Sequence, residues 1–126
     1  MTNPYKGRTG LDRIVHAAGH SLQGLRAAYI EESAFRQELW LAVVLVPLSY
    51  WIGQTWIERS LLIGSLIILL IVELLNSGIE ATVDRVSLDH HALSKRAKDL
   101  SSAAVFLALL LCGGIWGTAI WQRVAT

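Results

Sequence analysis

The sequence predicts an all-α integral-membrane protein, built from one amphipathic surface helix and three transmembrane helices. The 126 residues are 53% hydrophobic and only 17% charged, which is too apolar for an ordinary small soluble domain. Three stretches, 39–57, 60–79 and 100–122, are nearly free of charge and close to the roughly 20 residues that span a bilayer as a helix. A segment with helical periodicity precedes them.

The whole chain, residues 1–126, is expected to form one membrane domain. Residues 1–10 contain proline and glycine among small and basic residues, and are expected to be a flexible start. The surface helix is expected over 11–30, and the membrane helices over 34–57, 60–84 and 98–122. A soluble bundle of three apolar helices is the alternative fold. The net charge of +1 gives no indication of a nucleic-acid partner.

Apolar residues recur at spacings of three and four over residues 11–30, which predicts an amphipathic helix. The apolar stripe consists of Leu11, Ile14, Val15, Ala18, Leu22, Leu25 and Tyr29, and the residues facing away are Arg13, His16, His20 and Gln23. Such a helix lies at a membrane surface, with its apolar side at the headgroup boundary and its basic side chains in water. A soluble helix packed on another element is the alternative.

The first membrane helix, expected over 34–57, follows a polar cluster that includes Glu32 and Glu38. These two acids lie near headgroup depth and are additional candidates for a polar site. Pro47 removes one backbone hydrogen bond, which transmembrane helices tolerate when neighbouring groups compensate. Trp51 is interpreted first as an interfacial anchor and second as a lipid contact.

The second membrane helix, 60–84, carries acids out of an otherwise apolar run. At about 100° per residue, four polar side chains fall within an arc of roughly 80° on one helix face. They are Glu73, Asn76, Glu80 and Asp84. An ionisable group at the depth of Glu73 is costly and is by default functional. Pairing with a neighbouring helix is the alternative, but three acids need several partners and the membrane segments offer few cations.

The loop at 85–98 leads into the third membrane helix. Lys98 and Asp99 begin that helix on the same side as the acidic stripe, so a folded hairpin brings a cation and another acid to it. His90 and His91 are adjacent, and adjacent side chains rarely converge on one metal ion. Solvated loop histidines are the commoner case.

The distribution of lysine and arginine predicts the orientation. Basic residues cluster before the first span and in the loop at 85–98, whereas Arg59 is the only one in the first connection and Arg123 the only one at the far end. Positive-inside counting therefore puts the amino terminus and the loop at 85–98 in the cytoplasm.

These residues have the chemistry of a lipid kinase. Carboxylates are hard ligands suited to Mg²⁺, and Glu32 and Glu80 can supply two of them. Lys98 and Arg13 can neutralise polyphosphate charge, and Glu73 can take a proton from a lipid hydroxyl. The sequence has neither a Gly-x-x-x-x-Gly-Lys-Ser/Thr loop nor the protein-kinase signatures. Phosphoryl transfer must therefore be built on helices at a membrane surface.

Three segments resemble signatures of the bacterial integral-membrane diacylglycerol kinase family. They are Val-Glu-Leu-Leu-Asn-Ser-Gly-Ile-Glu-Ala-Thr-Val-Asp-Arg at 72–85, Ala-Ala-Tyr-Ile-Glu-Glu-Ser-Ala-Phe-Arg-Gln-Glu at 27–38 and Arg-Ala-Lys-Asp at 96–99. Ala-Ala-Gly at 17–19 and Ser-Ala-Ala-Val at 102–105 extend the similarity over nearly the whole chain. The resemblance implies a homotrimer in the bacterial inner membrane, with active sites shared between subunits. It also implies Mg²⁺-dependent transfer of the ATP γ-phosphoryl group to diacylglycerol.

The resemblance implies a role for each candidate residue. Glu73 corresponds to the catalytic base, and Glu32 and Glu80 to the ligands of Mg²⁺. Nucleotide contacts are implied for Glu32, Glu80, Arg13, His20, Asp89, His90, His91, Lys98 and Asp99. Contacts with the lipid substrate are expected for Asn76, Ser102, Glu38, Trp51 and Arg59.

Some positions of the surface helix depart from the better-known members. Those members carry a lysine and an aromatic where this chain has His16 and His20, and tryptophan and lysine where it has Leu22 and Gln23. The departures weaken the nucleotide contact carried over to His20. A related branch phosphorylates undecaprenol, so undecaprenol kinase is one alternative function. An ion- or proton-conducting oligomer and a structural membrane subunit are alternatives from other classes.

Overall fold

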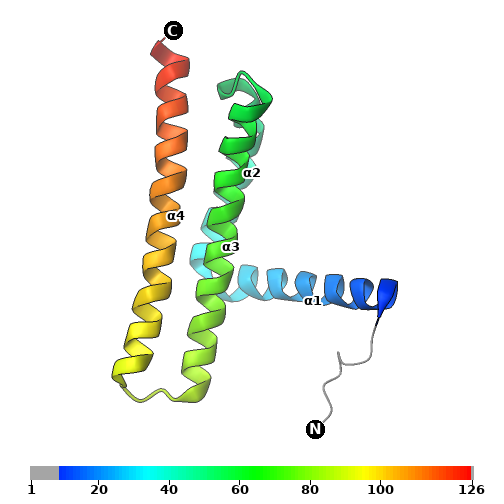
Figure 1. Ribbon diagram of the computed structural model, residues 1–126, viewed down its shortest axis with the longest axis vertical. Helices are drawn as coiled ribbons and strands as arrows, with labels where there is room; N and C mark the ends of the chain where they lie inside the picture. Colours follow the sequence, from blue (N-terminus) through cyan, green and yellow to red (C-terminus); the bar gives the residue numbers. More distant parts are fainter. Residues whose placement is uncertain (1–8, 126) are drawn as a thin grey trace.

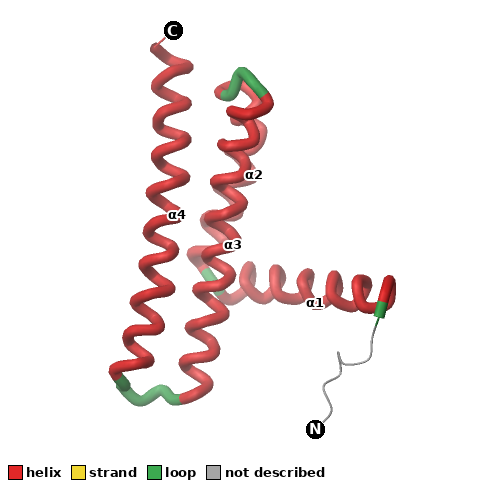
Figure 2. The backbone as a smooth tube through the Cα atoms, viewed as in Figure 1, coloured by secondary structure: helices red, strands yellow, loops and turns green. Residues whose placement is uncertain are grey.

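The computed structural model describes residues 9–125, and these residues fold into four helices without a strand. The helices are α1 (Gly10–Glu31), α2 (Ser33–Ile52), α3 (Trp56–Val86) and α4 (Ala92–Ala125). Figure 2 shows that only short connections separate them. The prediction of an all-α protein is confirmed. Residues 1–8 of the expected flexible start lie outside the described residues.

The helices are arranged as a narrow bundle with one arm. α3 and α4 run antiparallel and form the main helix pair, and α2 packs against α3 while hardly contacting α4. Figure 1 shows α1 projecting sideways from the bundle, as an arm joined to the lower end of α2. The α3–α4 loop therefore lies at one end of the bundle, and the α2–α3 turn lies with the carboxyl terminus at the other.

The α2–α3 turn begins earlier than the sequence predicts, because α2 ends at Ile52 rather than at residue 57. Gly53 leaves the helix with an extended backbone, although its N–H still donates to Ser49 O at 2.8 Å. A capping box then starts α3: Thr55 Oγ1 accepts from the Glu58 N–H at 3.1 Å, and Glu58 Oε2 accepts from the Thr55 N–H at 3.2 Å.

The α3–α4 loop is shorter than predicted, because α4 begins at Ala92 rather than at residue 98. His91 starts this helix in the manner of a capping residue. Its Nδ1 accepts from the Leu93 N–H at 3.0 Å, and its carbonyl accepts from the Lys95 N–H at 2.9 Å. The histidine therefore has a structural role in the loop.

Apolar residues from three helices form the core. Leu62 and Leu66 of α3 are each 1% exposed and pack with Ala42, Ile52, Cys112 and Trp116. Trp116 Nε1 of α4 donates to the Leu62 carbonyl oxygen at 3.1 Å. Ser65 Oγ donates to the same oxygen at 2.9 Å, so both polar groups are satisfied inside the α3–α4 interface.

Among the described residues, two helices are long and apolar enough to cross a membrane, α3 and α4. Only 28% of the most apolar window of α3, and 17% of that of α4, is buried within the chain. Their remaining apolar side chains face outward, as expected for helices that contact lipid or other membrane helices. α2 falls short of the same criterion because its first turns carry Arg36 and Glu38. A third span through α2 therefore stays a prediction.

Candidate functional site

The deepest residue of the acidic stripe of α3, Glu73, is buried inside the bundle. Glu73 is 5% exposed, and it is the only buried charged side chain among residues 9–125. Its neighbours on the stripe become more accessible toward the loop end: Glu80 is half-buried and Asp84 is exposed. The predicted stripe therefore runs from the bundle interior to the α3–α4 loop.

Other acids converge on Glu73 from separate elements. Its carboxylate interacts electrostatically with Glu80 on α3 and with Glu32, the residue between α1 and α2. Glu38 on α2 interacts with Glu73 as well. Like charges brought together in this way repel, and the arrangement is unfavourable unless a cation or a proton offsets it. The fold thus brings carboxyl groups from three separate elements within electrostatic range of Glu73, and these four acids are called the acidic cluster.

Three buried polar atoms near this cluster have no hydrogen-bond partner within the described part of the chain. They are Glu38 Oε2, Asn76 Oδ1 and Ser77 Oγ. Leaving a buried polar group unsatisfied costs about 1–3 kcal/mol, so such atoms usually await a ligand, water or a partner chain. Ser77 was not among the residues predicted from the sequence. Its signal was weak, namely a hydroxyl beside Asn76 in an apolar run.

The hairpin of α3 and α4 places Lys98 at the acidic stripe. Lys98 Nζ donates to Asp84 Oδ1 at 2.7 Å, joining the two helices across the loop. Lys98 also interacts electrostatically with Glu80. Asp99 is turned to the partner on its own helix, where its Oδ2 accepts from Lys95 Nζ at 2.6 Å. Lys98, the cation predicted to reach the stripe, therefore lies at the loop end of the stripe.

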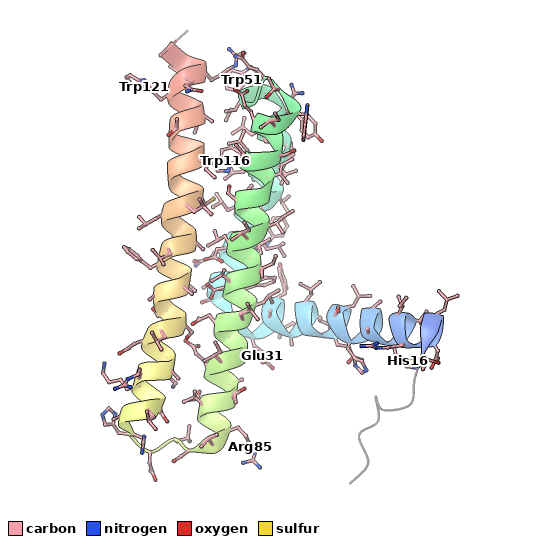
Figure 3. The ribbon with its side chains drawn as sticks, in the orientation of Figure 1. His16, Glu31, Trp51, Arg85, Trp116 and Trp121 are labelled. Atoms are coloured by element: carbon pink, nitrogen blue, oxygen red, sulfur yellow. The ribbon has the colours of Figure 1, made fainter. Side chains whose placement is uncertain are left out.

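The other loop and α4 residues lie near the same end. Asp89 and His90 are exposed in the loop, and the Asp89 N–H donates to Ser87 Oγ at 3.0 Å. Ser102 is exposed on α4, whereas Ser101 is buried and donates to the Lys98 carbonyl oxygen at 3.0 Å. Figure 3 shows Arg85, in the last turn of α3, at this end of the molecule.

Two predicted nucleotide contacts lie on the projecting arm. Arg13 and His20 are exposed on α1, which extends away from the bundle (Figure 1). At about 1.5 Å per residue, Arg13 lies roughly 27 Å along the helix from Glu31. The structure therefore does not bring Arg13 to the acidic cluster of its own chain.

Trp51 and Arg59, the other predicted lipid contacts, lie at the opposite end of the bundle. Figure 3 shows Trp51 near Trp121, far from Arg85. Arg59 Nε donates to the Gly53 carbonyl oxygen at 3.1 Å and thereby closes the α2–α3 turn. Along α3, Arg59 is about 21 Å from Glu73 at 1.5 Å per residue. These two residues are separate from the acidic cluster.

The cluster offers two carboxylates suited to a divalent cation. No group of three or more His, Cys, Asp or Glu side chains is arranged to hold a metal within residues 9–125. Glu32 and Glu80 both act on Glu73, and Mg²⁺ commonly takes one or two protein carboxylates with water and substrate phosphates as its other ligands. The donor chemistry of this pair therefore fits Mg²⁺ brought in with a polyphosphate.

The fold and the cluster define an all-helical protein with membrane-length helices and its polar chemistry near one end. The family model described as "Prokaryotic diacylglycerol kinase" matches residues 19–120. The chain is 52% identical over 118 residues to a diacylglycerol kinase of Pseudomonas aeruginosa, covering 94% of this chain and 96% of the relative. It is 48% identical over 115 residues to a diacylglycerol kinase of Escherichia coli K12, covering 91% and 94%.

A diacylglycerol kinase of Haemophilus influenzae is 47% identical over 109 residues, covering 86% of this chain and 92% of the relative. The chain belongs to the prokaryotic diacylglycerol kinase family. The family recognised from residues 72–85, 27–38 and 96–99 is thereby confirmed.

Proposed function

We propose that this chain is an ATP-dependent lipid kinase that converts diacylglycerol to phosphatidic acid in the bacterial inner membrane. Membership of the family and the shared name of its relatives support this activity. The observation that carries the proposal is the buried Glu73, with three further carboxyl groups acting on it from α2, α3 and the α1–α2 junction. α2, α3 and α4 cross the membrane, with the amino terminus and the α3–α4 loop in the cytoplasm.

Glu73 is the general base of the reaction. It accepts the proton of the primary hydroxyl of diacylglycerol as the hydroxyl oxygen bonds to the γ-phosphorus of ATP, and the bond from that phosphorus to ADP breaks. The burial of Glu73 beside Glu32, Glu38 and Glu80 supports this role, because an ionisable group at this depth is costly unless it has a chemical task.

Glu32 and Glu80 hold the metal of Mg·ATP. Bound Mg²⁺ supplies positive charge that offsets the negative charge of the phosphates and of the acidic cluster. Each of these glutamates contributes carboxylate oxygens from a different element, so the position of the nucleotide depends on how the α1–α2 junction sits against α3. Lys98 adds a cation at the mouth of the stripe, and Asp84 is its partner before the nucleotide arrives.

The remaining nucleotide contacts come from the α3–α4 loop and from the arm. Asp89, His90, His91 and Asp99 belong to the loop end of the bundle. Arg13 and His20 belong to α1, which cannot deliver them to the cluster of its own chain. We therefore assign them to the site of a neighbouring subunit, in a homotrimer that shares its active sites.

The lipid hydroxyl is bound beside Glu73. Glu38, Asn76 and Ser77 each bury a polar atom without a partner in residues 9–125, and a glycerol backbone has the hydroxyl and ester groups to satisfy them. Ser102 on α4 completes this group. Trp51 and Arg59 lie at the other end of the bundle, so any lipid contact of theirs is separate from this group.

The test is Mg²⁺-dependent transfer from ATP by the purified protein in lipid-like detergent, with diacylglycerol and undecaprenol offered side by side. The expected result is phosphatidic acid from diacylglycerol, and its loss in Glu73→Gln with Mg·ATP binding retained. Preference for undecaprenol would keep the mechanism but refute the substrate. Transfer to neither lipid, together with Glu73-dependent ion flux in sealed vesicles, would replace the kinase with a conducting oligomer.

A further inference from the structure

The corner between α1 and α2 is made by a single residue, and that residue is the proposed metal ligand Glu32. α1 ends at Glu31 and α2 begins at Ser33, so Glu32 alone has an extended backbone, with φ −112° and ψ 106°. A one-residue joint fixes neither the angle between two helices nor the direction of its own side chain, since both of its dihedrals can rotate. The Glu32 N–H donates to the Ala28 carbonyl oxygen at 2.9 Å, and the Glu32 carbonyl oxygen accepts from the Arg36 N–H at 3.1 Å. These backbone bonds join Glu32 to each helix, and side-chain contacts between α2 and the end of α1 add to them.

Arg36 of α2 bonds to the exposed end of α1. Its Nη1 donates to the carbonyl oxygen of Tyr29 at 2.7 Å and to that of Ile30 at 3.2 Å. The last carbonyls of a helix have no partner within the helix, so Arg36 satisfies two groups that would otherwise rely on water. Its guanidinium carbon also lies 6.0 Å from the centre of the Tyr29 ring, within the range of a cation–π contact.

Trp40 strengthens the same contact one helical turn further along α2. Its Nε1 donates to Tyr29 Oη at 3.1 Å. Arg36 and Trp40 are four residues apart and therefore share one face of α2. Arg36 thus holds the backbone of Tyr29, and Trp40 holds its hydroxyl. Together these contacts fix the end of α1 against α2 across Glu32.

We propose that Arg36 is a positioning residue for Mg·ATP, acting through Glu32. The inference depends on the proposed function, because it takes Glu32 as a metal ligand. The clamp formed by Arg36, Trp40 and Tyr29 holds the Glu32 carboxylate in register with Glu80 on α3, so that both can bind one ion. Residues that orient metal ligands affect metal affinity or activity by about 10- to 100-fold.

The first test separates the two substrates. Arg36→Gln is expected to lower kcat/KM for Mg·ATP by about 10- to 100-fold, mainly through KM, while KM for diacylglycerol stays at its wild-type value. Arg36→Lys should recover part of the loss, because an ammonium can reach one carbonyl but cannot form the planar guanidinium contact. Arg26→Gln is the matched control, since Arg26 is an exposed arginine of α1. It should leave both KM values unchanged.

A double-variant comparison tests whether Arg36 acts through Glu32. If it does, adding Arg36→Gln to Glu32→Gln should cost little more than Glu32→Gln alone. Additive losses, or an equal loss for both substrates, would overturn the proposal. Tyr29→Phe removes only the hydroxyl that Trp40 binds, and it should give a smaller loss in the same direction if Arg36→Gln does not fold.

A distance measurement tests the clamp without relying on activity. Spin labels at Gln23 on α1 and Ile67 on α3, in a Cys112→Ala background diluted with unlabelled protein, report the position of the arm. Arg36→Gln should broaden the distance distribution, and an unchanged distribution would overturn the clamp. If the wild-type protein transfers no phosphoryl group, the proposed function fails, whereas a broadened distribution would still separate that failure from failure of the clamp.

Discussion

Each end of the bundle has an arginine that bonds backbone carbonyls at a helix junction, but the groups around that arginine differ between the two ends. At the α1–α2 corner, Arg36 bonds two backbone carbonyls and lies over Tyr29. At the α2–α3 turn, Arg59 bonds the carbonyls of Gly53 and Tyr50 and lies 5.7 Å from the Tyr50 ring. Each arginine therefore closes a junction between helices.

The two ends differ in whether the polar groups around these arginines are paired. At the turn, the capping box is complete, and Arg123 lies 4.6 Å from the Trp51 ring while its Nε donates to the Trp51 carbonyl oxygen at 3.2 Å. At the corner, carboxylates repel one another, and buried atoms of Glu38 and Asn76 have no partner among residues 9–125. An end with satisfied groups favours stability, and an end with unsatisfied ones is ready to bind something.

Apart from Glu73, the largest effect on activity is expected from the metal ligands at the acidic end. Glu80→Gln keeps the shape of the side chain and removes its charge, so it should lower kcat/KM for Mg·ATP by at least about 100-fold, beyond what supporting residues contribute. Stability should change little, because the repulsion with Glu73 and the attraction to Lys98 are removed together. Titration of activity with Mg²⁺ measures the effect. Unchanged Mg²⁺ dependence would rule out Glu80 as a ligand.

The next effect is expected at the turn, and it concerns stability. A Cβ on Gly53 would lie 2.8 Å from Arg59 Cγ and 3.0 Å from the Ser49 carbonyl oxygen, so Gly53→Ala forces the turn apart. Overpacking of this kind costs about 1–3 kcal/mol in the free energy of unfolding, which denaturation in detergent can measure. The activity of the folded fraction should not change.

Gly24→Ala is the control for that substitution. A Cβ at Gly24, in the exposed arm, meets no atom within 4 Å, and alanine is the better helix former. It should leave stability unchanged or slightly raised. A loss of stability equal to that of Gly53→Ala would show that crowding at the turn is not the cause.

A smaller effect is expected in the interface between α3 and α4. Trp116→Phe removes the hydrogen bond to the Leu62 carbonyl, which still accepts from Ser65 Oγ. Because the acceptor stays satisfied, the loss should be about 1 kcal/mol of unfolding free energy. Thermal unfolding monitored by circular dichroism measures it. A loss of several kcal/mol would mean that the indole has a larger packing role.

The smallest effect is expected from an exposed ion pair. Lys95 and Asp99 are four residues apart on α4, and both side chains are 63% exposed. Pairs of this kind contribute less than about 0.5 kcal/mol, so Lys95→Ala should hardly change the unfolding midpoint. A midpoint that falls and becomes insensitive to salt would indicate that the pair is part of a larger network.

Much of the acidic cluster could be predicted from the sequence, because helical periodicity alone places Glu73, Asn76 and Glu80 on one face. The approach of Lys98 was also predicted, because a hairpin of the second and third membrane helices brings the start of the third to the acidic stripe. The separation of Arg59 from Glu73 follows from the rise of one helix.

Other features depend on tertiary contacts that no local pattern reveals. α2 ends at Ile52, before the predicted residue 57, and the close approach of Gly53 to Arg59 there is a tertiary contact that no local pattern reveals. The Arg36 clamp needs the angle between α1 and α2, which the sequence leaves open. Ser77 becomes a candidate only because its hydroxyl is buried without a partner within residues 9–125.

The central claim is that one end of the bundle performs chemistry and the rest supports it. The most direct measurement compares transfer rate and unfolding midpoint for Glu73→Gln and Trp116→Phe in the same detergent. We expect Glu73→Gln to lower the rate by about 10²- to 10⁴-fold without lowering the midpoint, and Trp116→Phe to lower only the midpoint. A Glu73→Gln protein that keeps its rate, or that loses rate only because it unfolds, would contradict the claim.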